Sequence, residues 1–124
     1  MAFLRKLTED LPSFPSKEYT SSEKTSYKMD SGTCYAWPLY SSPNISIAIW
    51  YNSAGCIFPK HQHSQKEWII VYEGEASLDI KGEIIKLRCG DSYKIDPEVV
   101  HGAKFKVDTR YVAITIPRSE DWPI

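Results

Sequence analysis

The histidines of this chain are few and closely spaced. The 124-residue sequence contains three, His61, His63 and His101, and a single residue separates the first two. Residues i and i+2 of a β-strand point to the same face, so His61 and His63 would project together. Glu67 has the same parity and joins that face if the backbone stays extended between them. Two imidazoles and a carboxylate directed at one point suit a divalent first-row metal ion.

His101 is the one histidine that remains, and it follows a strand-and-turn unit over Gly90–Pro97. It would complete a shell of three nitrogens and one oxygen. A lone His-x-His pair is more often a surface or core pair without a metal, but here every histidine of the chain fits the pattern. We therefore favour a metal site. Because imidazoles bind metal only when neutral, metal occupancy is expected to fall as the pH drops through roughly 6 to 5.

Composition argues against several classes of function. Lys plus Arg number 15 and Asp plus Glu number 16, and this net charge of −1 gives no support to a nucleic-acid partner. No apolar run approaches the roughly 20 residues that cross a membrane. The N-terminus carries charges where a secretory signal has an apolar stretch, so we expect a cytoplasmic location. The cysteines are expected to be small buried side chains, with a pocket-lining thiol as the alternative for the last two: Cys34, Cys56 and Cys89.

Short strands are the elements expected to position the candidate ligands. Residues 1–27 are polar and predict an N-terminal arm with at most one helical turn over 3–11, whereas residues 28–124 predict one β-domain. Hairpin turns are expected at Glu73–Glu75 and Lys81–Gly82. About eight short strands at this spacing indicate an all-β sandwich or small barrel. They are expected over 44–52, 67–72, 75–81, 83–87, 92–95, 103–107 and 110–116, with a weaker candidate over 28–37.

The spacing of these residues resembles that of the cupin superfamily over roughly residues 44–116. Gly55-x5-His61-x-His63-x3-Glu67-x6-Gly74 is similar to the first cupin signature, and Gly90-Asp91 with Pro97 and His101 resembles the second. The resemblance implies a small antiparallel β-barrel, the double-stranded β-helix or jelly roll. It also implies one divalent ion, Fe, Mn, Ni, Co, Cu or Zn, held in the barrel mouth by four ligands: His61, His63, Glu67 and His101.

The sequence departs from the family pattern at two positions. Glu98 stands where the family usually has glycine, and Phe105 stands where asparagine is common. Neither position is a metal ligand in the family, so we expect an altered pocket shape near His101 and an intact metal site.

Other residues are candidates for the walls of a substrate pocket, with the plain protein core as the alternative for each. These candidates are Tyr51, Phe58, Ile69 and Phe105. If Glu67 faces the lumen, alternation places Trp68 and Tyr72 on the opposite face of the same strand. An aromatic outer face of this kind would suit a homodimer, as is common among cupins.

Three functions stay open at this point. The first is a metal-dependent enzyme of the dioxygenase, isomerase, decarboxylase or lyase type, acting on a small oxygen-bearing metabolite. An octahedral ion with four protein ligands keeps one or two positions for substrate. Glu67 argues mildly against cysteine-oxidising thiol dioxygenases, which usually lack the carboxylate ligand. The alternatives are a non-catalytic module that binds or senses a small molecule, and a barrel that keeps its metal without using it.

Overall fold

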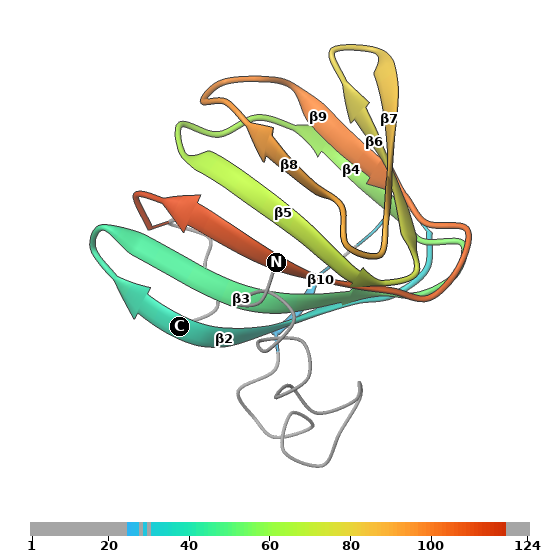
Figure 1. Ribbon diagram of the computed structural model, residues 1–124, viewed down its shortest axis with the longest axis horizontal. Coiled ribbons are helices and arrows are strands. Elements are labelled where there is room, and N and C mark those ends of the chain that lie inside the picture. The colour runs from blue at the N-terminus through green and yellow to red at the C-terminus, as the bar shows by residue number, and fades with distance from the viewer. Residues whose placement is uncertain (1–24, 28, 30, 119–124) are drawn as a thin grey trace.

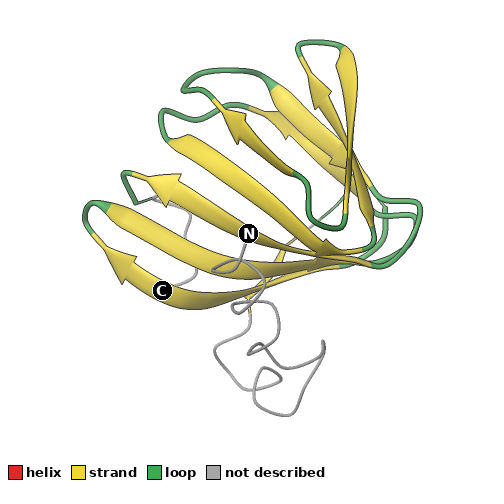
Figure 2. Ribbon diagram, in the orientation of Figure 1, coloured by secondary structure: helices red, strands yellow, loops and turns green. Residues whose placement is uncertain are grey.

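The structure is a computed structural model that describes residues 25–27, 29 and 31–118. It contains strands and no helix in that part of the chain (Figure 2). Within it, therefore, no helix is long and apolar enough to cross a membrane. The strands in chain order are β1 (Thr25–Tyr27), β2 (Cys34–Ser42), β3 (Ile45–Asn52), β4 (Ile57–His61), β5 (Lys66–Glu73), β6 (Glu75–Ile80), β7 (Glu83–Arg88), β8 (Ser92–Ile95), β9 (His101–Lys104) and β10 (Thr109–Ile116).

The strands form two antiparallel sheets, which Figure 1 shows as two layers. The six-stranded sheet has the order β1-β2-β3-β10-β5-β8, and the four-stranded sheet has the order β4-β9-β6-β7. Strands far apart in sequence are neighbours, since β10 lies between β3 and β5 while β9 lies between β4 and β6. The all-β expectation is confirmed.

The main core lies between the sheets and arises from alternation along the central strands. In β3, Ala48 and Trp50 point into this core, and β10 contributes Tyr111 and Ala113. The intervening residues point to the other face of the six-stranded sheet. There Ile49 packs in a second cluster with Trp37, Tyr35, Tyr51 and Tyr72. Both faces of β3 are therefore apolar, as its near-continuous run of Ile, Ala, Trp and Tyr requires.

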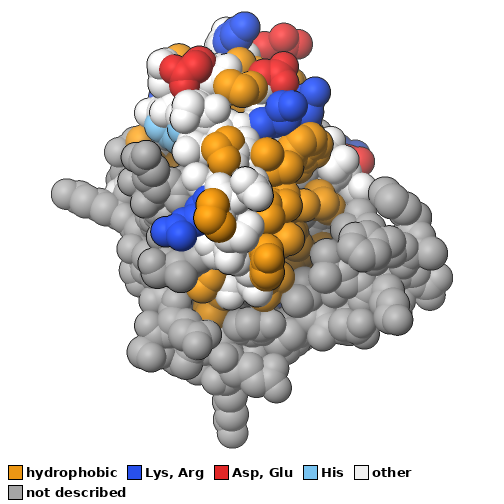
Figure 3. Space-filling model, turned by 90° about the vertical axis from the view of Figure 1, so that its left-hand side faces the viewer, with side chains coloured by type: hydrophobic (Ala, Val, Ile, Leu, Met, Phe, Trp, Pro, Cys, Tyr) orange, Lys and Arg blue, Asp and Glu red, His pale blue; other side chains and the backbone are white. Residues whose placement is uncertain are grey.

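Some large apolar side chains remain exposed on the described part of the chain. Figure 3 shows hydrophobic side chains gathered in one area of the surface, below a group of charged residues. The exposed large apolar residues are Leu39, Tyr40, Ile84, Val100, Val107 and Ile116. Trp68 and Tyr72 are partly buried, and the homodimer expected through their face stays a prediction.

Several strand boundaries differ from those expected. β1 lies within the segment assigned to the arm and pairs with β2. β2 extends to Ser42, and β4 was not among the expected strands. The strand expected over 103–107 is instead β9, which starts at His101 because Ile80 of β6 and His61 of β4 pair with that residue. The helical turn expected over 3–11 lies outside the described residues.

The hairpin expected at Lys81–Gly82 joins β6 to β7, but the one expected at Glu73–Glu75 is wrong, because that turn joins β5 of one sheet to β6 of the other. Both turns depend on left-handed backbone. Lys81 and Gly82 have φ of 54° and 88°, the combination that a two-residue type I′ hairpin requires. Gly74 has φ of 86°, and a Cβ at this position would lie 2.4 Å from the carbonyl oxygen of Asp108. Glycine is therefore needed at residue 74 both for its conformation and for the close approach of the β9–β10 connection.

Glu98, the departure from the family pattern, also has a left-handed backbone, with φ of 65°. This region costs a non-glycine residue about 1–2 kcal/mol, whereas glycine loses about 0.5–1 kcal/mol of backbone entropy on folding. We expect Glu98→Gly to raise the free energy of unfolding by about 0.5–1 kcal/mol in urea titrations. Glu98→Ala is the control, because it removes the exposed carboxylate and keeps Cβ. A Glu98→Gly protein no more stable than Glu98→Ala would contradict this account.

Candidate functional site

The three histidines, distant in sequence, lie side by side in the structure. His61 ends β4, His101 begins β9, and the two residues are paired across the four-stranded sheet. Their ring centroids are 4.2 Å apart, and the ring of His63 lies 5.0 Å from His101 and 5.6 Å from His61. One ring nitrogen from each histidine lies within 4.8 Å of the other two. The antiparallel pairing of β4 with β9 therefore brings the two sequence motifs together.

Backbone carbonyls orient all three rings in the same way. A carbonyl oxygen only accepts hydrogen bonds, so the Nδ1 atom that contacts it carries the proton. The Nε2 atom of each neutral ring then holds a lone pair, as metal-binding histidines do. The three Nδ1–H groups donate to carbonyls two residues away: His61 to Pro59 at 3.0 Å, His63 to Gln65 at 2.9 Å, and His101 to Val99 at 2.8 Å.

Glu67 of β5 faces the histidines from the other sheet. Its Oε1 lies 3.1 Å from Nε2 of His63 and 3.6 Å from Nε2 of His101. When both rings are neutral and protonated at Nδ1, each contact places an Nε2 lone pair against a carboxylate oxygen. These atoms repel each other unless a cation lies among them. A proton can serve this purpose for one pair, and a metal ion can serve it for all of them.

His101 provides an independent test of whether a metal ion fits. Its side chain is 6% exposed, and its Nε2 is buried and makes no hydrogen bond in the described part of the chain. A buried polar atom without a hydrogen bond costs roughly 1–3 kcal/mol. A metal ion would remove that cost, and a donor set of imidazole nitrogens and one carboxylate suits divalent first-row ions. The residues therefore fit the expected group.

The ionisation of these side chains follows from the same contacts. Burial alone would raise the pKa of Glu67, but interactions with His101 and His63 outweigh it and lower the pKa to about 2. The hydrogen bond to Glu67 outweighs burial at His63 and raises the pKa of that ring, whereas burial lowers the pKa of His61. Glu67 is therefore ionised at neutral pH, and His61 stays neutral to lower pH than His63.

A hydrogen bond links the loops that carry the two motifs. The backbone N–H of Glu98 donates to the carbonyl oxygen of His63 at 2.8 Å. The left-handed turn at Glu98 thus lies against the loop that presents His63, three residues before His101. Glu98 affects the site through its backbone, and its side chain is exposed.

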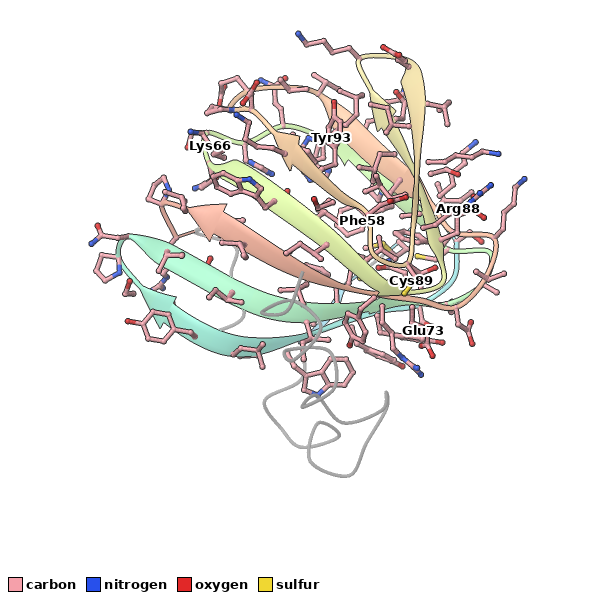
Figure 4. All side chains as sticks on the ribbon, in the orientation of Figure 1. Phe58, Lys66, Glu73, Arg88, Cys89 and Tyr93 are labelled. Carbon is pink, nitrogen blue, oxygen red and sulfur yellow. The ribbon has the colours of Figure 1, made fainter. Side chains whose placement is uncertain are left out.

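A pocket of about 550 Å³ opens beside the histidines. The structure places Phe58, Ile69 and Phe105 in its walls, together with the histidines and Glu67. Phe58 is labelled in Figure 4 and belongs to β4. The pocket also includes residues that sequence reasoning missed: Met29, Trp50, Pro59, Ala76, Leu78, Gly102, Ala103, Tyr111 and Thr115.

The expectation that Tyr51 lines the pocket is wrong. Tyr51 packs on the opposite face of β3, where its ring stacks on that of Tyr35 at a centroid distance of 6.2 Å. Its neighbour Trp50 lines the pocket instead. Tyr51 shares its parity with Ile47 and Ile49, which also face away from the main core. The sequence carries no signal for the inner face of β3, because both faces of this strand are apolar.

The cysteines are buried in two of the three positions. Cys34 and Cys56 lie in the main core, and the expectation of burial is confirmed for both. Burial, with the neighbouring Cys56, raises the pKa of Cys34 to about 12, and burial also raises the pKa of Cys56. Cys89, labelled in Figure 4, is exposed, so the expectation is wrong for it. It lies in the turn after β7, and its thiol donates a hydrogen bond to the carbonyl oxygen of Tyr72 at 3.1 Å.

Comparison with known proteins places this geometry in a family. A protein-family model described as "Cupin domain" matches residues 51–117. A comparison with curated proteins gave no match. Among solved structures, an RmlC-like cupin from Shewanella frigidimarina is 22% identical with a TM-score of 0.72, over 90% of this chain and 96% of that one. KdgF from Halomonas sp. is 20% identical with a TM-score of 0.68, over 78% and 91% of the two chains.

A third similar structure is the EutQ protein of Clostridium difficile. It is 19% identical with a TM-score of 0.64, over 74% of this chain and 72% of that one. Likeness at these identities concerns the fold alone. It confirms the expected double-stranded β-helix of the jelly-roll type.

The contacts of Glu67 predict how the histidines titrate in the metal-free protein. We expect His63 to titrate above its ordinary value of 6.5 and His61 below it. In Glu67→Gln the pKa of His63 should fall, because the carboxylate that favours the charged ring is removed while burial remains. Because there are few histidines, NMR titration of their ring signals can follow each one. A His63 pKa below that of His61, or one unchanged in Glu67→Gln, would contradict the arrangement.

Proposed function

The chain belongs to the cupin family, and on that premise we propose that it is a metal-dependent enzyme acting on a small oxygen-bearing metabolite. The observation that carries this proposal is the shared orientation of the rings. The Nδ1 atom of every histidine donates to a backbone carbonyl, so the Nε2 lone pairs remain for an ion. A protein that used these residues only for packing would gain nothing from presenting lone pairs and a carboxylate to one another.

The residues that would hold the ion are His61, His63, Glu67 and His101. Neutral imidazoles and one carboxylate leave a divalent ion with a net charge of about +1 and one or two positions for substrate. When bound, such an ion supplies Lewis-acid polarisation of an oxygen-bearing substrate. The pocket beside the histidines supports a substrate at this place, because it contains these same residues and is large enough for a small metabolite.

The remaining side chains of the pocket limit how the protein itself moves protons. Glu67 is held ionised by its histidine neighbours, so it acts as a ligand at neutral pH and has no proton to give. The Nδ1–H groups of the histidines are engaged with backbone carbonyls. Tyr111 is then the remaining titratable side chain among the described residues that line the pocket. Its ring stacks on those of Trp50 and Phe105, in the aromatic part of the pocket, so the side chains at the histidine end hold the ion and do not supply a proton.

Turnover by defined metal forms tests this proposal. The untagged full chain would be loaded in turn with Fe, Mn, Ni, Co, Cu or Zn and assayed on 2-oxo acids, diols and diketones, with and without dioxygen. We expect at least one metal form to convert at least one compound. His63→Ala should lower both metal affinity and turnover by on the order of 100-fold or more, since it removes a ligand.

Gln62→Ala is the matched control, because Gln62 is exposed between the two histidines. It should keep both metal content and turnover. Tight ligand binding by every metal form with no turnover would instead establish a binding or sensing module. Unchanged metal content in His63→Ala would show that the ligand assignment is wrong.

A further inference from the structure

A continuous series of aromatic rings leads away from the histidine cluster. The ring of Phe58 lies 5.2 Å from that of His61, and its other neighbour is Trp50, at 6.1 Å. Trp50 is parallel to Tyr111 at 6.2 Å, and Tyr111 is parallel to Phe105 at 6.1 Å. All of these residues line the same pocket. A ligand whose oxygen-bearing group (its head) reaches the histidines therefore has the rest of its structure (its body) against Phe58 and Trp50.

The walls of this pocket offer little to a charged or hydroxylated body. No lysine or arginine lines it in the described part of the chain. The Thr115 hydroxyl is hydrogen-bonded to the Ser46 hydroxyl across the sheet. Ile69 and Leu78 continue the apolar surface. A phosphate or a row of hydroxyls placed here would lose its water without gaining equivalent partners, which is unfavourable.

The pocket is large enough for a ligand bigger than a two- or three-carbon acid. Its volume of about 550 Å³ lies within the range of roughly 300–1,000 Å³ that is usual for small-molecule sites. The head group would occupy the end at the histidines, and the aromatic part of the pocket remains for a ring.

We propose that the ligand class of this site is an oxygen chelate with an aromatic body, such as a 2-oxo acid that bears a ring, rather than a sugar acid or a phosphorylated metabolite. The inference rests on the proposed metal site. It adds the chemical class of the ligand's body, the part that lies away from the ion. The aromatic series from Phe58 to Phe105 recognises the ring, and the histidine cluster determines where the oxygen atoms lie.

Binding to the cobalt-loaded full chain tests this inference without any need for turnover. The visible absorption of Co²⁺ would be followed while phenylpyruvate, pyruvate or 2-keto-gluconate is added. These probes share the 2-oxo acid head and differ in the body, which is a ring, a methyl group or a chain of hydroxyls. We expect phenylpyruvate to bind at least about tenfold more tightly than pyruvate, because its ring is buried. 2-Keto-gluconate should bind no more tightly than pyruvate.

A variant on β4 and a control on the outer face of the six-stranded sheet test the role of the aromatic series. Phe58→Leu should reduce the preference for phenylpyruvate over pyruvate by at least about threefold while Co²⁺ affinity stays unchanged, because leucine keeps apolar volume and loses the ring contact. Tyr51→Leu removes an aromatic ring from the opposite face, where Tyr51 packs with Ile49. This control should keep the preference of the wild type.

The outcomes separate this inference from the proposed function. Failure of the wild-type chain to bind Co²⁺ would overturn the proposed function and, with it, this inference. With Co²⁺ bound, equal or tighter binding of pyruvate or 2-keto-gluconate would overturn the inference alone. So would a cobalt spectrum that responds to none of the probes, or a preference lost equally in Tyr51→Leu and Phe58→Leu.

Discussion

The structure of the site depends on one hydrogen bond from the ring of each histidine to a nearby backbone carbonyl. Every Nδ1–H donates to a carbonyl two residues away. Pro59 lies at the irregularity in the pairing of β4 with β9, and Gln65 and Val99 lie in the loops before β5 and β9. None of these three residues has a partner in the strand pairing of the described residues, so their carbonyls are available to hold a ring. The consequence is that unprotonated Nε2 atoms and the Glu67 carboxylate are directed at one another. This arrangement is favourable only with a cation among them.

The two sheets contribute different parts of the site, and this explains how distant residues meet. His61 and His101 are neighbours within the four-stranded sheet, through the pairing of β4 with β9. Glu67 comes from β5 of the six-stranded sheet, where Ile95 and Thr115 flank it. An ion bound by all of them would therefore connect the two sheets. The aromatic residues between the sheets form the walls of the pocket, so the core and the pocket are one structure.

Spacing along the sequence was enough to place the candidate ligands, whereas the pocket needed the structure. His-x-His with a carboxylate of equal parity predicts one face of an extended segment, and this prediction is wrong for Glu67, because the chain bends at 64–65 and Glu67 reaches the histidines from β5 of the other sheet. The residues themselves do meet, since His61, His63 and Glu67 lie together with His101. Parity could not place Tyr51 or Trp50, because β3 is apolar on both faces and alternation then leaves its orientation open. The strand expected over 103–107 starts two residues earlier, at His101, because its start depends on pairing with β4 and β6. The homodimer and the cytoplasmic location stay predictions.

X-ray absorption spectroscopy of the cobalt-loaded full chain tests the central claim most directly, because it counts the rings and identifies the atoms around the ion. The account predicts one ion per chain, with outer-shell scattering from the imidazoles of all three clustered histidines, and with oxygen and no sulfur in the first shell. Glu67→Gln should keep the imidazole count and alter the oxygen shell. Scattering from fewer imidazoles, or a sulfur ligand from a cysteine, would contradict the account.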